Sequence, residues 1–275
     1  MSSVFLLNPR RPTATAVQYF FWSHPEWWTV AVCWLAWAMM LLHNWQNAGH
    51  GIHHHTSFAQ ELRSWMWMVA AMMLPLALNN VRLTAARSLW ARRHRAVAGF
   101  LAGYLAPWLV LGIAASVLLQ SSRTHTYAAP ALGFAVAALW QRTRAHKRAF
   151  IACHRTLPLA PLGWRAHRDC LLFGCTIGVA CVCSCWPLML ACAFAGHSPI
   201  AMAGGMAVGV SERWSFRPRT RVALAATLAL ASYYAALAAL NHGPAISSPQ
   251  PARPQVRSSD SPSAIARAPA TAPSR

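Results

Sequence analysis

Long runs of apolar residues, separated by short basic segments, constrain this chain more than any other feature. Two such runs occupy residues 28–45 and 222–240. A bilayer core of about 30 Å is crossed by roughly 20 apolar residues in a helix. Lipid offers no hydrogen-bond partners to the backbone, so each apolar segment has to be helical. The sequence therefore predicts an all-α fold, a polytopic transmembrane helical bundle.

Hydropathy and charge together predict seven spans. They lie at about 27–45, 64–81, 98–120, 125–140, 170–194, 199–211 and 222–240. Successive segments outside the spans hold 2, 1, 5, 1, 7, 0, 4 and 4 Lys and Arg residues. Because basic loops stay inside, this alternation predicts an N-terminus inside and a C-terminal tail outside.

The predicted spans divide the chain into three regions: a cytoplasmic N-terminal segment at 1–26, a transmembrane helical domain at 27–240, and a disordered Pro/Ser/Ala-rich tail at 241–275. The tail holds too little apolar surface to offset the entropy cost of ordering it. We expect a multi-pass protein of a bacterial inner (plasma) membrane. We also expect tryptophans near span ends to lie at the membrane interface, namely Trp27, Trp28, Trp45, Trp65, Trp108, Trp140 and Trp214.

The charge balance is strongly basic, with 24 Lys and Arg residues against five acidic ones. Such an excess can indicate nucleic-acid binding, but here the charges cluster between apolar runs. We therefore predict contact with the lipid bilayer and none with nucleic acid. The sequence contains no P-loop, GxSxG or HExxH motif and no paired carboxylates within a span, so we do not expect an enzyme.

The fifth span holds six of the eight cysteines. Cys181, Cys185, Met189 and Cys192 share one helix face, whereas Cys175 and Cys183 point elsewhere. Thiolates and thioethers are ligands that select Cu(I), and thiolates also bind Zn(II). Pro187 should kink this helix and free a backbone carbonyl. The alternative is that cysteine serves only as a small packing residue.

One helix supplies few well-placed ligands, so a closed site needs a donor from a neighbouring helix. The second span carries Met72 and Met73 in the segment AMMLP, and one of them is the expected donor. The alternative for the methionines is that they fill gaps between helices.

The first outer loop is rich in histidine. Four imidazoles within six residues could capture a divalent ion on the outer face, at His50, His53, His54 and His55. A merely solvated polar loop is the alternative.

Several of these motifs resemble the predicted metal-binding integral membrane protein family, whose domain has no established function. Its W-x-x-M-x-x-A-M-M-x-P pattern is met from Trp65 to Pro75, its G-Y-L-x-x-W from Gly103 to Trp108, and its C-x-G-C-C-W-x-L-M in part from Cys181 to Met189. Ser184 stands where the family has a cysteine, and the family's inner-loop cysteine pair is reduced to Cys153. Glu212–Arg213 resembles its closing E-K, and we expect those two side chains to form an interfacial ion pair.

Three functions follow from these patterns, and the lack of acid and base groups disfavours one of them, a membrane-embedded enzyme or redox protein that uses cysteine thiols. The first of the other two is a membrane protein that binds or moves a soft transition metal, with copper favoured. It would be a transporter, or a delivery partner for an outward-facing metalloprotein or membrane complex. The second is a structural or assembly subunit of a membrane complex without a metal site of its own. The metal content of the purified protein separates the two.

Overall fold

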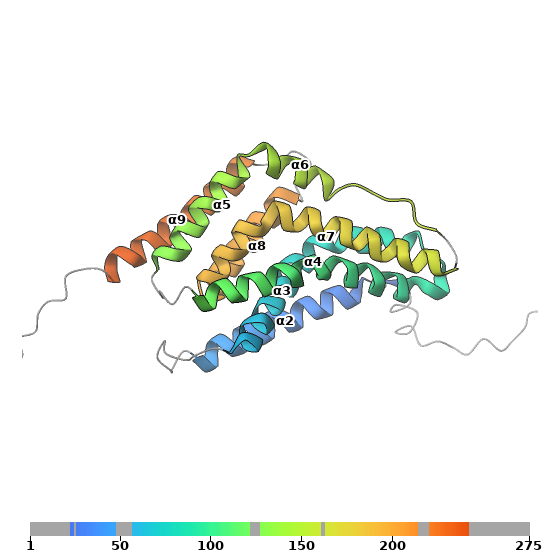
Figure 1. The fold of residues 1–275 in the computed structure, drawn as a ribbon, viewed down its shortest axis with the longest axis horizontal. Coiled ribbons are helices and arrows are strands. Elements are labelled where there is room, and N and C mark those ends of the chain that lie inside the picture. Colours follow the sequence, from blue (N-terminus) through green and yellow to red (C-terminus); the bar gives the residue numbers. More distant parts are fainter. Residues whose placement is uncertain are drawn as a thin grey trace, which may run out of the picture. The chain divides into compact units, whose positions relative to one another are not determined.

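The computed structural model of this chain describes residues 23–24, 26–47, 57–121, 127–160, 163–213 and 220–241. Within these residues every regular element is helical, which confirms the predicted all-α class (Figure 1). The elements are α2 (Trp27–Asn47), α3 (Phe58–Ala86), η1 (Trp90–Arg92), α4 (Arg93–Ser121), α5 (Ala128–Gln141), α6 (Arg144–Ala152), α7 (Gly163–Phe194), α8 (Pro199–Arg213) and α9 (Thr220–Asn241). The predicted tail lies outside the described residues.

Each of the seven predicted spans coincides with a helix, but fewer of them qualify as spans. Four described helices are long and apolar enough to cross a membrane, namely α3, α4, α7 and α9. Helices α5 and α8 have 14 and 15 residues. At 1.5 Å per residue they measure only about 21–23 Å, short of a core of about 30 Å. Helix α2 has 21 residues and is not among these four.

Helices α4 and α7 pack with their backbones in direct contact. Glycines permit this: a Cβ added to Gly103 would lie 2.1 Å from Leu171 O, and one added to Gly174 would lie 2.0 Å from Phe100 O. Small residues of this kind let membrane helices approach closely. The approach places Tyr104, next to Gly103, against the cysteine-rich half of α7.

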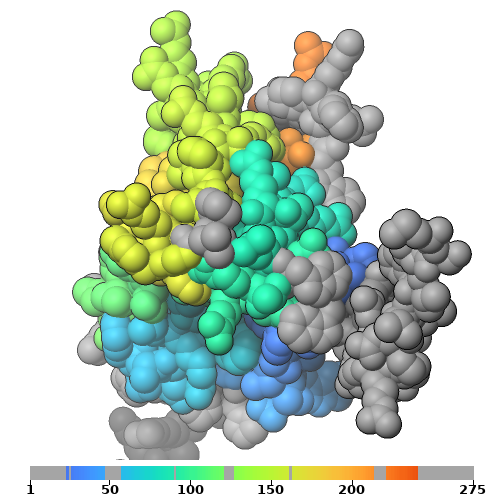
Figure 2. Space-filling view, turned by 90° about the vertical axis from the view of Figure 1, so that its right-hand side faces the viewer, coloured from blue at the N-terminus to red at the C-terminus, as the bar shows by residue number. Residues whose placement is uncertain are grey.

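The start of α7 is also fixed to the region where α3 ends and α4 begins. Arg87 donates to Leu157 O at 3.2 Å and Arg92 donates to Gly163 O at 3.3 Å. Figure 2 shows these segments side by side on one face, in teal and yellow. The long helices that carry the methionines and cysteines are thereby held together at this end.

Two helix-interior prolines release backbone carbonyls, as predicted for Pro187. A proline has no N–H, so the carbonyl four residues earlier loses its helical partner. Trp140 Nε1 donates to Cys183 O at 3.1 Å, four residues before Pro187. In α3, Cys33 Sγ donates to Ala71 O at 3.4 Å, four residues before Pro75. Side chains from neighbouring helices therefore provide hydrogen-bond donors to both released carbonyls.

Two of the tryptophans expected at the interface lie in the core, so that prediction is wrong for Trp65 and Trp108. They are 1% and 0% exposed. Trp65 Nε1 donates to Trp108 O at 3.0 Å, and its ring occupies the space that Gly112 leaves open. For Trp65 the physical reason is that α3 begins six residues before the predicted span, so this residue falls at an interior position of the helix. Trp108 lies near the middle of both the predicted span and α4, so it was not at a span end. Trp214 lies outside the described residues.

Candidate metal centre

The predicted sulfur face of α7 points into the protein. Cys181, Met189 and Cys192 are fully buried and Cys185 is 8% exposed. Cys183 is exposed. The helical periodicity of the sequence was therefore a correct guide to which sulfur atoms share the interior.

Met73 of α3 brings a sulfur atom from another helix to this face. Its Sδ atom lies 3.9 Å from Cys181 Sγ. Tyr104 of α4 holds the contact, because its hydroxyl donates to Met73 O and interacts with Cys181 Sγ, both at 3.2 Å. Three helices thus converge on one buried thiol.

Met72 takes a different position. A Cβ built on Gly205 of α8 would meet Met72 Cε at 2.8 Å and Cys192 Sγ at 3.1 Å. Met72 and Cys192 therefore converge on the bare backbone of α8, away from Cys181. Of the two methionines proposed as donors, Met73 is the one that reaches the Cys181 thiol.

Helix α6 brings a third cysteine to the cluster. Cys153 caps this helix and is 1% exposed. Its thiol interacts with Cys181, and Cys153 Sγ lies 4.0 Å from Ser184 Oγ. Ser184 Oγ is in turn 3.3 Å from Cys185 Sγ. We call Met73, Cys153, Cys181 and Cys185 the sulfur cluster.

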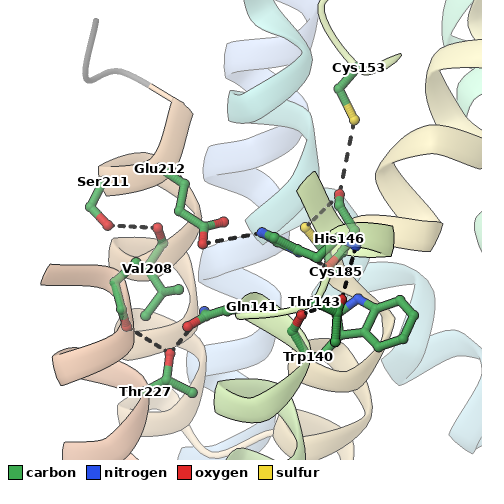
Figure 3. A network of polar contacts seen from close by, with 12 residues as sticks. Trp140, Gln141, Thr143, His146, Cys153, Cys185, Val208, Ser211, Glu212 and Thr227 are labelled. Atoms are coloured by element: carbon green, nitrogen blue, oxygen red, sulfur yellow. Dashed lines mark hydrogen bonds and ion pairs between the residues drawn. The ribbon is translucent and has the colours of Figure 1, made fainter. Parts of the chain in front are cut away.

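A histidine and a glutamate lie beside the sulfur cluster (Figure 3). His146 of α6 donates from Nδ1 to Ser184 O at 3.1 Å, and its Nε2 lies 3.5 Å from Glu212 Oε1 of α8. These two residues, Ser184 and Cys185 border a cavity of about 10 Å³, which is space for about one water molecule. Polar side chains thus lie on the side of the cluster that Cys185 forms.

Two ionisable groups at the cluster, His146 on α6 and Cys153 at its end, have shifted pKa values. Burial by itself lowers the pKa of His146, but the hydrogen bond and the charge of Glu212 outweigh burial and raise it. The interaction with Cys181, together with burial, raises the pKa of the Cys153 thiol well above its ordinary value. Glu212 therefore makes the protonated form of His146 more favourable than in a free imidazole, and Cys153 is favoured as a neutral thiol.

The expected ion pair between Glu212 and Arg213 is not what the structure shows. Glu212 faces His146, while Arg213 Nη1 donates to Leu76 O at 2.7 Å. Neighbouring residues on a helix point in different directions, which is the physical reason for the correction.

Not every predicted ligand enters this arrangement. The histidine loop with His50, His53, His54 and His55 lies outside the described residues. Within the described residues, no group of three or more His, Cys, Asp or Glu side chains is placed to hold a metal ion. A donor set at the sulfur cluster therefore has to combine two thiols with the thioether of Met73.

Sequence reasoning missed the contributions of Tyr104 and His146. Tyr104 belongs to the G-Y-L-x-x-W motif but had no assigned role. A glycine before a tyrosine in an apolar helix is the signal that could have indicated close packing. His146 and Cys153 are seven residues apart, so they share a face of the amphipathic helix α6, and this spacing was available in the sequence.

The family PpoB2, described as a copper chaperone, matches residues 62–237, well over half of the 275 residues. The chain belongs to this copper chaperone family. No curated protein and no solved structure matches the chain. The match bears out the expected relation to copper. Its description differs from that of the predicted metal-binding integral membrane protein family, which the motifs resemble.

The sulfur cluster of this copper chaperone family member lies within the matched residues, as do Tyr104, His146 and Glu212. Helix α2 and the histidine loop precede the match. The cluster is thus part of the region that matches the family, whereas the loop lies outside that region.

Proposed function

We propose that this protein is a multi-pass membrane copper chaperone that carries Cu(I) at the sulfur cluster. Copper is the cargo, and its ligands are the thiolates of Cys181 and Cys185 and the thioether of Met73. One observation carries the proposal: Met73 Sδ lies 3.9 Å from Cys181 Sγ although the two residues are on different helices. Soft sulfur donors in low coordination number suit Cu(I) better than harder ions.

The proposal explains why the donors are mixed. A thioether binds Cu(I) more weakly than a thiolate, so a site with Met73 suits temporary carriage rather than storage. Metal binding also replaces thiol protons, so an apo site of neutral thiols avoids an unpaired charge in the membrane. The family of copper chaperones supports copper as the cargo.

The proposed direction of delivery rests on the outer histidine loop. We propose that the chain lies in a bacterial inner membrane and exchanges copper with an outward-facing metalloprotein or membrane complex. The loop histidines would capture metal there, and replacing His50, His53, His54 and His55 with Ala should lower its affinity for Cu(II) at pH 7. Unchanged affinity would remove the loop from the mechanism.

The test of the cluster is a double substitution, Cys181→Ala/Cys185→Ala, in the full chain purified in detergent. Cu(I) stoichiometry is measured by titration under anaerobic conditions. We expect the parent to bind Cu(I) and the double variant to lose this binding. The matched control is Cys175→Ala/Cys183→Ala, which removes two cysteines of the same helix from outside the cluster.

A folded double variant that keeps its copper would overturn the proposal. The sulfur atoms would then serve only to pack the helices, and the structural or assembly subunit of a membrane complex would become the better assignment.

A further inference from the structure

Arg213 is a cation at the end of α8. Hydrogen bonds satisfy only part of its guanidinium group. Its Nη1 donates to Leu76 O at 2.7 Å. Its Nη2 is buried and has no hydrogen-bond partner among the described residues. An arginine side chain stays protonated in proteins, so this is a permanent positive charge with unused donors. Such a charge is costly within an apolar bundle unless something offsets it.

The position of Leu76 shows how near this charge lies to the sulfur cluster. Leu76 and Met73 are three residues apart on α3, which corresponds to a rise of about 4.5 Å along the helix. Tyr104 binds Met73 O and contacts Cys181 Sγ. The guanidinium group is thus about one helical turn from the Cys181 contact, and its charge acts on Cys153, Cys181 and Cys185.

No carboxylate in the described part of the chain pairs with Arg213. Glu212 is engaged with His146 at 3.5 Å, and the other ion pairs join Glu26 to His24 and Arg82. The thiols of the sulfur cluster and the hydroxyl of Tyr104 are the described groups near Arg213 that can become negative, and a thiol loses its proton more readily than a phenol.

The charge of a loaded cluster depends on the ion. Two thiolates and Cu(I) sum to one negative charge, which is costly to bury without a counter-charge. Two thiolates with a divalent ion sum to zero, and a buried cation beside that complex then has no partner. A fixed positive charge one turn away therefore favours the monovalent ion and disfavours the divalent one.

We propose that Arg213 is the counter-charge of the loaded sulfur cluster and sets its preference for Cu(I) over divalent ions such as Zn(II). The assignment rests on the proposed copper site and adds a specificity-determining residue to it. Arg213 acts through its charge and need not coordinate the metal.

The experiment replaces Arg213 with Gln, whose amide can still donate to Leu76 O, and with Lys, which keeps the charge. Affinities for Cu(I) and Zn(II) are measured by competition with chromogenic chelators on the full chain in detergent. We expect Arg213→Gln to weaken Cu(I) binding at least tenfold and to leave Zn(II) binding unchanged or stronger. Arg213→Lys should retain most of the Cu(I) preference. Arg148→Gln, at an exposed position on α6, controls for the loss of a positive charge.

A second background tests the charge argument directly. In Cys185→Ser, one thiolate and Cu(I) sum to zero, so adding Arg213→Gln should cost much less Cu(I) affinity than it does in the parent. Should Arg213→Gln fail to fold, Arg213→Met provides the neutral variant for the same comparison.

The results separate the two proposals. If folded Arg213→Gln or Arg213→Met shows a lower thermal midpoint but the parent ratio of Cu(I) to Zn(II) affinity, Arg213 is a structural residue and the inference is overturned while the copper site stands. A parent chain that binds no Cu(I) overturns the copper site and this inference together.

Discussion

Adding one methyl group at Gly103 should disturb both the packing of α4 on α7 and the sulfur cluster. The Cβ atom of Gly103→Ala would lie 2.1 Å from Leu171 O and 2.9 Å from Cys175 N. An ordinary carbon-to-oxygen contact is about 3.3 Å or longer, so the two backbones have to separate by roughly 1 Å. Neither atom belongs to a flexible side chain, so the separation cannot be avoided by a rotamer change.

The expected loss of stability is roughly 2 kcal/mol. Overpacking costs about 1–3 kcal/mol, and a clash with backbone belongs at or above the upper end of that range. Replacing a helical glycine with alanine stabilises the helix by up to about 1 kcal/mol, which offsets part of this cost. Separation by roughly 1 Å would also lengthen the Tyr104 contact to Cys181, now 3.2 Å, beyond hydrogen-bonding distance.

The assay is thermal unfolding of the full chain in detergent, followed by tryptophan fluorescence, together with Cu(I) titration. Gly99→Ala is the matched control, because it lies one turn earlier on α4 and its Cβ would be 3.7 Å from Cys170 Cβ, an ordinary contact. We expect Gly103→Ala to unfold at a lower temperature and to bind Cu(I) more weakly than Gly99→Ala. Equal stability and equal Cu(I) affinity of the two variants would refute the close-packing argument.

Three further outcomes are expected. Trp140→Phe should lower the free energy of unfolding by about 0.5–1.5 kcal/mol, the net contribution of one hydrogen bond, because it removes the donor to Cys183 O, and an unchanged free energy of unfolding would contradict this. The pair of His146 and Glu212 should stabilise the protein below the unfolded pKa of histidine, about 6.5, and lose that effect as the pH rises through the raised folded pKa. Unfolding midpoints of the parent and Glu212→Gln between about pH 5.5 and 8.5 should therefore differ most at low pH, and parallel curves would argue against the pair. Reporters fused to the two ends of the chain should be active on opposite sides of the membrane if seven segments cross, whereas activity on one side would favour the four long apolar helices.

The helices themselves were predictable because their cause is local. Apolar runs such as 222–240 have to become helices in lipid, whatever surrounds them. The i, i+4 spacing of Cys181 and Cys185 likewise sets which face they share, and Pro187 removes a donor in any context. These statements depend on backbone geometry and on the chemistry of single residues, so the sequence carries them completely.

The number of helices that cross the membrane was harder to predict, because it depends on where each helix ends. Hydropathy and charge alternation gave seven spans, but the lengths of α5 and α8 fall short of a bilayer core. Helix ends depend in part on contacts between distant segments, such as Arg87 at the end of α3 donating to Leu157 O. Those contacts involve tertiary positions that periodicity does not contain.

The composition of the candidate site was decided by tertiary structure. Cys181 and Met73 are 108 residues apart in sequence, and their contact exists because glycines let α4 lie against α7 while Tyr104 bridges to α3. No local rule distinguishes Met73 from Met72, since the choice depends on how α3 is rotated about its own axis against α7. The sequence alone determined which atoms could bind a soft metal, and only the packing of three helices determined which of those atoms meet.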